Sequence, residues 1–134
     1  MQKPEAGLPA ESSGHPNVLH DVTIAFIGAG AMGEAMMRGL LNSGLVPPGA
    51  LVASDPREGR AEELRALHGV RAVEKNRDAV RDAQIVILSV KPQVLRAVFR
   101  DLRGAIPRGA LVLSIVAGAR VESIARGLRC VPVT

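Results

Sequence analysis

The chain has 134 residues, of which 47% are hydrophobic, and a formal net charge of +4 from 17 basic and 13 acidic residues. This length predicts one ordinary domain with a core of its own. No apolar run approaches the roughly 20 residues that a membrane-spanning helix needs, and the first residues lack the apolar block of a secretory signal. We therefore expect a cytoplasmic protein with no membrane partner.

The composition also argues against several kinds of site. The single cysteine, Cys130, excludes an intramolecular disulfide and a thiol-rich metal site, and we interpret it as a buried packing thiol. Two of the three histidines, His15 and His20, lie in or beside the polar N-terminal segment, and His68 precedes a glycine at a predicted helix end, so we expect no metal centre. The arginines are scattered and aromatic residues make up 1% of the chain, which argues against a nucleic-acid partner. An anionic cofactor or substrate explains the positive charge better.

The chain divides into two parts by composition. Residues 1–20 are rich in proline, glycine and serine and have no hydrophobic period, which predicts a disordered leader. From Val22 onward, short apolar runs alternate with amphipathic segments. This alternation is typical of a parallel sheet with helices on its faces, and it predicts one domain over residues 21–134.

The first predicted strand, residues 23–27, runs directly into a Gly-x-Gly-x-x-Gly pattern. In such a turn the first glycine permits a tight bend, the second lets a pyrophosphate approach the backbone, and the third lets helix and strand pack closely. A helix predicted over residues 31–42 follows, and its N-terminal amides favour an anion. The pattern predicts a dinucleotide-binding turn, with contacts from Gly28, Ala29, Gly30, Ala31, Met32 and Gly33.

A second strand, residues 51–54, ends at Asp55, which has two open interpretations. An acid at the end of this strand, about 20 residues after the glycines, accepts hydrogen bonds from an adenosine ribose and repels a 2′-phosphate. That arrangement favours NADH. Alternatively, Asp55 caps a helix that begins at Pro56 and ends near Leu67.

In the second interpretation, a 2′-phosphate is held by other side chains of the same loop. The candidates are the hydroxyl of Ser54 and the guanidinium groups of Arg57 and Arg60. That arrangement favours NADPH.

The middle of the chain predicts two further strands. A short strand over residues 70–73 precedes a brief helix, capped by Asn76, that continues to about residue 81. The run over residues 85–88 has no polar alternation, so it predicts a strand covered on both faces near the centre of the sheet. Lys91-Pro92 ends this strand, and a stripe at helical spacing follows: Val94, Leu95, Val98, Phe99 and Leu102.

The last part of the chain predicts a fifth strand over residues 111–116 and a helix near residues 121–128. A sixth strand begins at residues 131–134 and is cut short. Right-handed crossovers between these strands predict a doubly wound α/β sheet of Rossmann-like type, ordered 3-2-1-4-5. Its ligand crevice lies beyond the carboxyl ends of strands one and four.

Four loops converge on this crevice: the glycine turn and residues 54–57, 89–93 and 114–118. Small residues there let a flat ring approach the backbone. The candidate contacts from the last two loops are Ser89, Val90, Lys91, Pro92, Ala117 and Gly118. We assign no catalytic residue.

Three segments together carry a family resemblance: Phe26-Ile27-Gly28-Ala29-Gly30-Ala31-Met32-Gly33, Ser89-Val90-Lys91-Pro92-Gln93 and Ser114-Ile115-Val116-Ala117-Gly118. Over about residues 22–134 the chain resembles the amino-terminal dinucleotide-binding domain of pyrroline-5-carboxylate reductase. The resemblance implies hydride transfer from a reduced nicotinamide cofactor to the C=N bond of pyrroline-5-carboxylate, the last step of proline biosynthesis. It narrowly favours NADPH and implies that Asn76 lies beside the adenosine end of the cofactor.

The resemblance also implies a helical carboxy-terminal domain that supplies the substrate pocket, the proton donor and a homo-oligomer interface, and the 134 residues do not include one. We therefore expect that the chain alone holds the dinucleotide without turnover. A smaller departure is Arg120, which stands where the family has a small hydroxyl residue to start the last helix. Two alternatives stay open. One is the cofactor domain of another reductase, of hydroxyacid dehydrogenase or deazaflavin-dependent NADP oxidoreductase type; the other is a non-catalytic dinucleotide-sensing module.

Overall fold

A five-stranded parallel sheet forms the centre of the molecule in a computed structural model that describes residue 19, residues 21–129 and residues 133–134. The strand order is β3-β2-β1-β4-β5, which confirms the predicted doubly wound topology. The strands are β1 (Ile24–Ile27), β2 (Leu51–Ser54), β3 (Arg71–Val73), β4 (Ile85–Leu88) and β5 (Leu111–Ser114). Apart from residue 19, the leader expected over residues 1–20 lies outside the described residues, as does Cys130.

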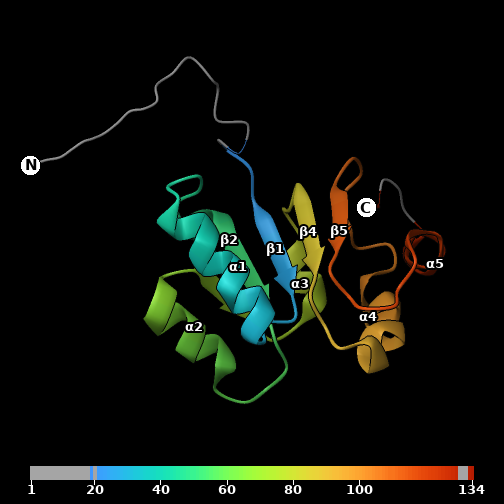
Figure 1. Cartoon of the computed structure of the whole chain (residues 1–134), viewed down its shortest axis with the longest axis horizontal. Coiled ribbons are helices and arrows are strands. Elements are labelled where there is room, and N and C mark those ends of the chain that lie inside the picture. Colours follow the sequence, from blue (N-terminus) through green and yellow to red (C-terminus); the bar gives the residue numbers. More distant parts are fainter. Residues whose placement is uncertain (1–18, 20, 130–132) are drawn as a thin grey trace, which may run out of the picture.

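Helices connect the strands and cover both faces of the sheet (Figure 1). They are α1 (Ala31–Asn42), α2 (Arg60–His68), α3 (Asn76–Val80), α4 (Leu95–Leu102) and α5 (Val121–Leu128), with short 3₁₀ turns η1 (Pro48–Ala50) and η2 (Pro92–Val94). No helix in the described part of the chain is long and apolar enough to cross a membrane.

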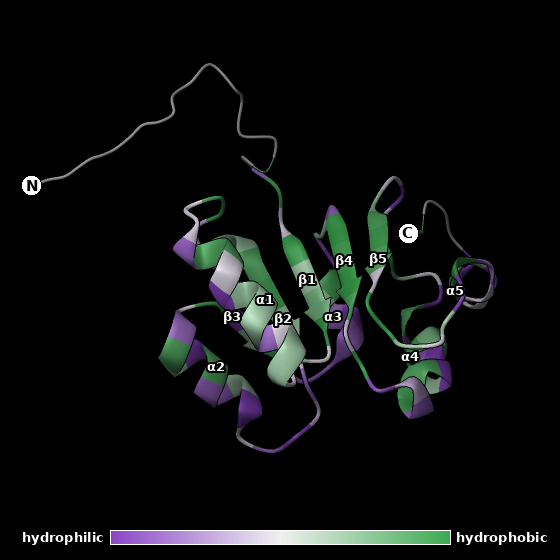
Figure 2. Ribbon diagram, in the orientation of Figure 1, coloured by the Kyte–Doolittle hydropathy of each residue, from purple (hydrophilic) through white to green (hydrophobic). Residues whose placement is uncertain are grey.

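The two faces of the sheet have separate cores because side chains alternate along each strand. In β1, Phe26 packs with Met37 of α1 and Leu64 of α2 on one face. Its neighbour Ile27 packs in the cluster on the other face, which includes buried residues of α3, α4 and α5. Figure 2 shows the consequence, with apolar strands inside and polar residues along the outer sides of the helices. Burial on both faces explains why the strands lack polar alternation.

The structure corrects two expected helix starts. Helix α2 begins at Arg60 after Gly59, a residue in the left-handed region with φ 79°, so Asp55 does not cap this helix and Pro56 is not its first residue. Helix α3 begins at Asn76 itself, with Lys75 at the capping position and no side-chain cap. In both places a side chain that favours capping instead contacts a part of the chain far away in the sequence, as described below.

Smaller observations concern the end of β5, the apolar stripe predicted for α4, and the last two residues of the chain. Strand β5 ends at Ser114, two residues before the expected end. In the predicted stripe of α4, Val98 and Leu102 are buried, but Val94 remains 46% exposed. At the sheet edge, Val133 forms a parallel bridge with Val112. Thr134 forms backbone hydrogen bonds with Val112 and Ser114, so residues 133–134 lie beside β5, on the side where a sixth strand was expected.

Candidate functional site

Two adjoining cavities lie at the carboxyl ends of β1, β2 and β4, where the doubly wound fold predicts a ligand crevice. One, of about 360 Å³, lies over the glycine turn and is lined by Asp55, Arg57 and Lys91 among others. The other, of about 460 Å³, extends between α3 and α4. They share Gly28, Pro56, Val90 and Val94 as lining residues, so together they form one continuous trough.

Two glycines of the turn are required by close packing inside the protein. Gly28 has φ +92°, and a Cβ atom there would lie 2.8 Å from the main-chain oxygen of Ser89. A Cβ atom on Gly33 would lie 2.8 Å from the main-chain oxygen of Gly28. These two positions therefore hold the turn tightly against the end of β4 and the start of α1 against β1.

Gly30 differs from the other two glycines of the pattern. It lies at the N-cap of α1 with φ −78°, which any residue can adopt, and a Cβ atom there would meet no atom within 4 Å. No side chain of the described residues caps α1. The first amides of the helix therefore face open space with their partial positive charge, and the protein itself gives no reason for a glycine here. A backbone cradle of this kind fits a pyrophosphate group.

The Asp55 carboxylate holds the glycine turn rather than a helix. Asp55 is 5% exposed, and its Oδ2 atom accepts a hydrogen bond of 3.2 Å from the Ala29 amide. Arg57 forms a bidentate pair with it, at 2.8 Å and 2.9 Å, and the Arg57 amide also donates to it. Burial alone would raise the pKa of Asp55, but the hydrogen bonds from Arg57 and Ala29 outweigh it and keep this pKa below its ordinary value.

The carbonyl of Ala29 is held from the other side by Arg60. The Arg60 guanidinium donates to this oxygen at 2.6 Å and 2.9 Å and pairs with Glu34 of α1 at 2.8 Å. His68 contacts the second oxygen of Glu34 at 2.7 Å. The hydrogen bonds from Arg60 and then His68 lower the pKa of Glu34 to about 2. Arg60 is therefore already used inside the protein, in contrast to its expected role toward a phosphate.

The Glu34 ion pair predicts a specific acid sensitivity. The folded protein keeps Glu34 ionised to a pH of about 2, whereas the unfolded chain protonates it near its ordinary value of 4.5. Unfolding below pH 4.5 thus takes up a proton, so the stability from Glu34 is complete above this pH and is lost as the pH falls toward 2. Glu34→Gln is expected to lower the free energy of unfolding at pH 7 by about 1–2 kcal/mol, and this difference should shrink between pH 4.5 and 2. Urea denaturation at several pH values measures both effects.

The control for this variant is Glu62→Gln, an exposed glutamate of α2 without an ion pair in the described part of the chain. It should leave the pH profile unchanged. If the free energies of unfolding of wild type and Glu34→Gln differed by the same amount at all pH values, Glu34 would not be the source of this acid sensitivity.

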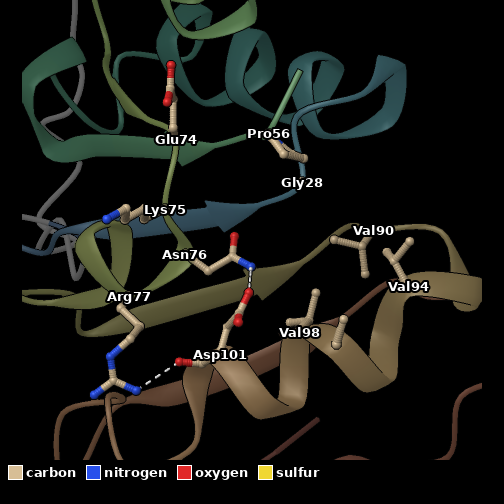
Figure 3. Close-up of a pocket in the computed structure, with 11 residues that line it drawn as sticks. Gly28, Pro56, Glu74, Lys75, Asn76, Arg77, Val90, Val94, Val98 and Asp101 are labelled. Atoms are coloured by element: carbon tan, nitrogen blue, oxygen red, sulfur yellow. Dashed lines mark hydrogen bonds between the residues drawn. The ribbon is translucent and has the colours of Figure 1, made fainter. Parts of the chain in front are cut away.

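The second cavity has a hydrogen-bonded chain along one edge (Figure 3). The buried Ser54 hydroxyl donates to Asn76 Oδ1 at 2.7 Å, and Asn76 Nδ2 donates to Asp101 Oδ2 at 3.1 Å. This chain links the end of β2 to α3 and α4. It replaces the expected capping by Asn76 and leaves Ser54 behind Asn76, outside the cavity lining.

The loop after β4 supplies the opposite side of the trough. The Ser89 hydroxyl donates to the main-chain oxygen of Gly28 at 2.5 Å, so it fastens this loop to the glycine turn. Lys91 is exposed and lines the first cavity, and its ammonium group forms no hydrogen bond or ion pair with residues 19, 21–129 or 133–134. Lys91 therefore remains available to an anionic ligand at this end.

The remaining predicted site residues lie outside the two cavities. Ala31 and Met32 are exposed on the first turn of α1, and Met32 has 65% of its surface exposed. Pro92 is exposed at the start of η2. Ala117 and Gly118 form an exposed turn after β5, and Gly118 has φ +77°.

Sequence reasoning missed the wall and edge that α4 contributes. Ala97, Val98 and Asp101 all line the second cavity. Asp101 follows Ala97 by four residues and Val98 by three, which places all three on one helix face, a signal available from the sequence once α4 is known to border the crevice. The predicted stripe did not reveal this wall, because apolar spacing does not distinguish a cavity wall from a packed interior.

Comparison with known proteins identifies the family. Residues 23–118 match the family model described as "NADP oxidoreductase coenzyme F420-dependent". The chain belongs to this family. The matched residues include the glycine turn, both cavities and the ends of all five strands, so the family assignment covers the whole candidate site.

Among relatives of this oxidoreductase domain are pyrroline-5-carboxylate reductases. That of Methanosarcina acetivorans is 42% identical over 100 residues, which cover 75% of this chain and 37% of the relative. That of Pseudomonas aeruginosa is 39% identical over 118 residues, which cover 83% of this chain and 43% of the relative. The solved structure of the Coxiella burnetii reductase matches with a TM-score of 0.75 and 26% identity over 80% of this chain and 40% of that one. The chain thus spans about 40% of the length of the relatives it matches, and the resemblance stated from the motifs is confirmed.

Proposed function

We propose that residues 21–134 form a dinucleotide-binding domain, with the diphosphate of the cofactor seated over Gly30 at the N-terminus of α1. The observation that carries this proposal is the open space at Gly30, where a Cβ atom would meet nothing while the uncapped amides of α1 point outward. The residues that border this position fit the group. Gly28 and Gly33 shape the turn, and Lys91 supplies a free positive charge.

We further propose that the adenosine half lies in the cavity between α3 and α4, beside Asn76. The nicotinamide half then extends past Ser89, Val90 and Lys91 toward Ala117 and Gly118. When bound, the reduced nicotinamide supplies a hydride. The residues of this chain hold its diphosphate and orient the ring at the carboxyl end of the sheet, and we assign none of them a catalytic role.

NADPH is the proposed cofactor because of the charges around Asp55. Both oxygens of this carboxylate already accept hydrogen bonds from Arg57, and one also accepts from Ala29, so its repulsion of a 2′-phosphate is reduced. The Arg57 side chain is 59% exposed, which leaves its guanidinium accessible to a phosphate. The family description, which names an NADP oxidoreductase, supports the same cofactor.

Arg57→Ala tests the cofactor choice. We expect the wild-type chain to bind NADPH in calorimetric titration more tightly than NADH. The variant should bind NADPH about tenfold more weakly and NADH within about twofold of wild type, because a charge-assisted contact to the 2′-phosphate is lost. Arg126→Ala, which removes an exposed arginine of α5 away from both cavities, is the control. An equal loss for both nucleotides would contradict the assignment, and a flat trace for both with wild type would contradict dinucleotide binding.

For the whole reaction, we propose the reduction of pyrroline-5-carboxylate at its C=N bond, the activity named for the relatives. This reduction needs a proton donor beside the hydride path, which we do not assign within this chain. We therefore expect the 134-residue chain to bind NADPH without oxidising it when pyrroline-5-carboxylate is added. Normal turnover of pyrroline-5-carboxylate by this chain would contradict this expectation. The cytoplasmic location and the homo-oligomer expected from the resemblance stay predictions.

A second candidate function follows from the family description, which names coenzyme F420. Under this alternative the same domain passes a hydride between NADP and F420. Reduction of F420 by NADPH, followed by the absorbance of the oxidised coenzyme, distinguishes this activity from pyrroline-5-carboxylate reduction.

A further inference from the structure

The cavity between α3 and α4 has two chemically different sides (Figure 3). Val90, Val94 and Val98 form an apolar wall, which suits the flat face of an aromatic ring. Asn76 and Asp101 lie at the other side and point toward one another from α3 and α4. A ring that lies against the valines therefore presents one of its edges to this amide and carboxylate pair.

The Asp101 carboxylate is held in place by contacts on both its main chain and its side chain. Asn76 Oδ1 accepts from the Ser54 hydroxyl at 2.7 Å, which orients the amide so that Nδ2 donates to Asp101 Oδ2 at 3.1 Å. Arg77 donates to the main-chain oxygen of Asp101 at 3.0 Å. Asp101 Oδ1 accepts no hydrogen bond from the described residues, and no cation among them neutralises the carboxylate.

We infer that Asp101 selects the base of the cofactor by accepting a hydrogen bond from the 6-amino group of adenine. This inference rests on the proposed dinucleotide function and names the residue that distinguishes adenine from other purines. An ionised carboxylate can only accept hydrogen bonds. Adenine presents an amino donor at position 6, whereas hypoxanthine and guanine present a carbonyl oxygen that a carboxylate repels.

The orientation of Asn76 strengthens this selection. Its oxygen accepts from Ser54 and one of its two Nδ2 hydrogens is donated to Asp101, so turning the amide over would break both bonds, and the acceptor offered at this edge is the Oδ1 atom of Asp101. The edge of the cavity therefore keeps an acceptor character. Because Asp101 is exposed and water competes for its oxygen, we expect a moderate selection, about tenfold.

The test compares NADPH with its hypoxanthine analogue, reduced nicotinamide hypoxanthine dinucleotide phosphate. The two differ only at position 6 of the base, and the fluorescence of the shared reduced nicotinamide reports the binding of both. Wild type should bind NADPH about tenfold more tightly than the analogue. Asp101→Asn should reduce this ratio to less than about twofold, because an amide can offer either an acceptor or a donor. Asp101→Ala should reduce it as well, mainly by weakening NADPH binding.

Asp82→Asn is the matched control, since Asp82 is an exposed aspartate in the turn before β4 and lines neither cavity. It should keep the wild-type ratio. Thermal unfolding confirms that each variant is folded. Equal binding of the two nucleotides by wild type, or an Asp101→Asn variant that weakens both equally, would overturn the inference while leaving dinucleotide binding intact. Failure of wild type to bind either nucleotide would overturn both.

Discussion

Gly30→Val is expected to weaken dinucleotide binding by about 100-fold while leaving the fold intact. The backbone at Gly30 has φ −78° and ψ −163°, which valine adopts readily, and a Cβ atom there meets no protein atom within 4 Å. The change should therefore alter the free energy of unfolding by no more than about 1 kcal/mol, the usual range for an N-cap substitution. In the proposed complex the branched side chain occupies the space of the diphosphate, and a 100-fold loss corresponds to about 2.7 kcal/mol.

Calorimetric titration with NADPH and urea denaturation of the same preparations measure the two effects separately. The matched control is Gly39→Val, at an exposed glycine in the middle of α1 where a Cβ atom also meets nothing within 4 Å. Valine has a higher helix propensity than glycine, so this variant should be as stable as wild type or slightly more stable and should bind NADPH normally. If Gly30→Val bound NADPH as tightly as Gly39→Val, the glycine turn would not be the diphosphate site.

Gly28→Ala is expected to cause the largest loss of stability, about 3 kcal/mol. Two costs combine at this position. Alanine is strained at φ +92°, and its Cβ atom would lie 2.7 Å from Val90 Cγ1 and 2.8 Å from the main-chain oxygen of Ser89. The second neighbour is backbone at the end of β4, which cannot move without disturbing the pairing of β4 with β1.

Gly44→Ala separates these costs. Gly44 has φ +75°, close to the value at Gly28, but a Cβ atom there meets nothing within 4 Å. This control carries the backbone cost alone, about 1 kcal/mol. The midpoint of urea denaturation, at unchanged m value, gives both differences. Equal losses of stability for Gly28→Ala and Gly44→Ala would mean that Ser89 and Val90 can move away from the added Cβ atom at no cost. That result would contradict the close packing of the turn.

Local patterns were sufficient for most of the fold. The bounds of α1, β2 and β4 agree with the expected ranges, because each is a continuous apolar or amphipathic run that a Gly, Asp or Pro follows within four residues. The strand order follows from such elements, because parallel strands joined by right-handed crossovers allow few arrangements. The errors fell at helix starts, where Asp55 and Asn76 had to be assigned from capping preference alone.

Within the site, residue patterns alone were sufficient to predict the glycine turn, the loops after β2 and β4 that border it, and the family. All of these depend on residue spacing within short segments and on the topology that the segments impose. Only the tertiary structure decided the partners of individual polar groups. Asp55 contacts Ala29, Arg60 pairs with Glu34, and Asn76 contacts Asp101 because helices and strands far apart in the chain pack side by side. A side chain that caps a helix stabilises the protein by only about 1 kcal/mol, whereas leaving a buried carboxylate without hydrogen-bond partners destabilises it by more. The packing therefore determines where these side chains point.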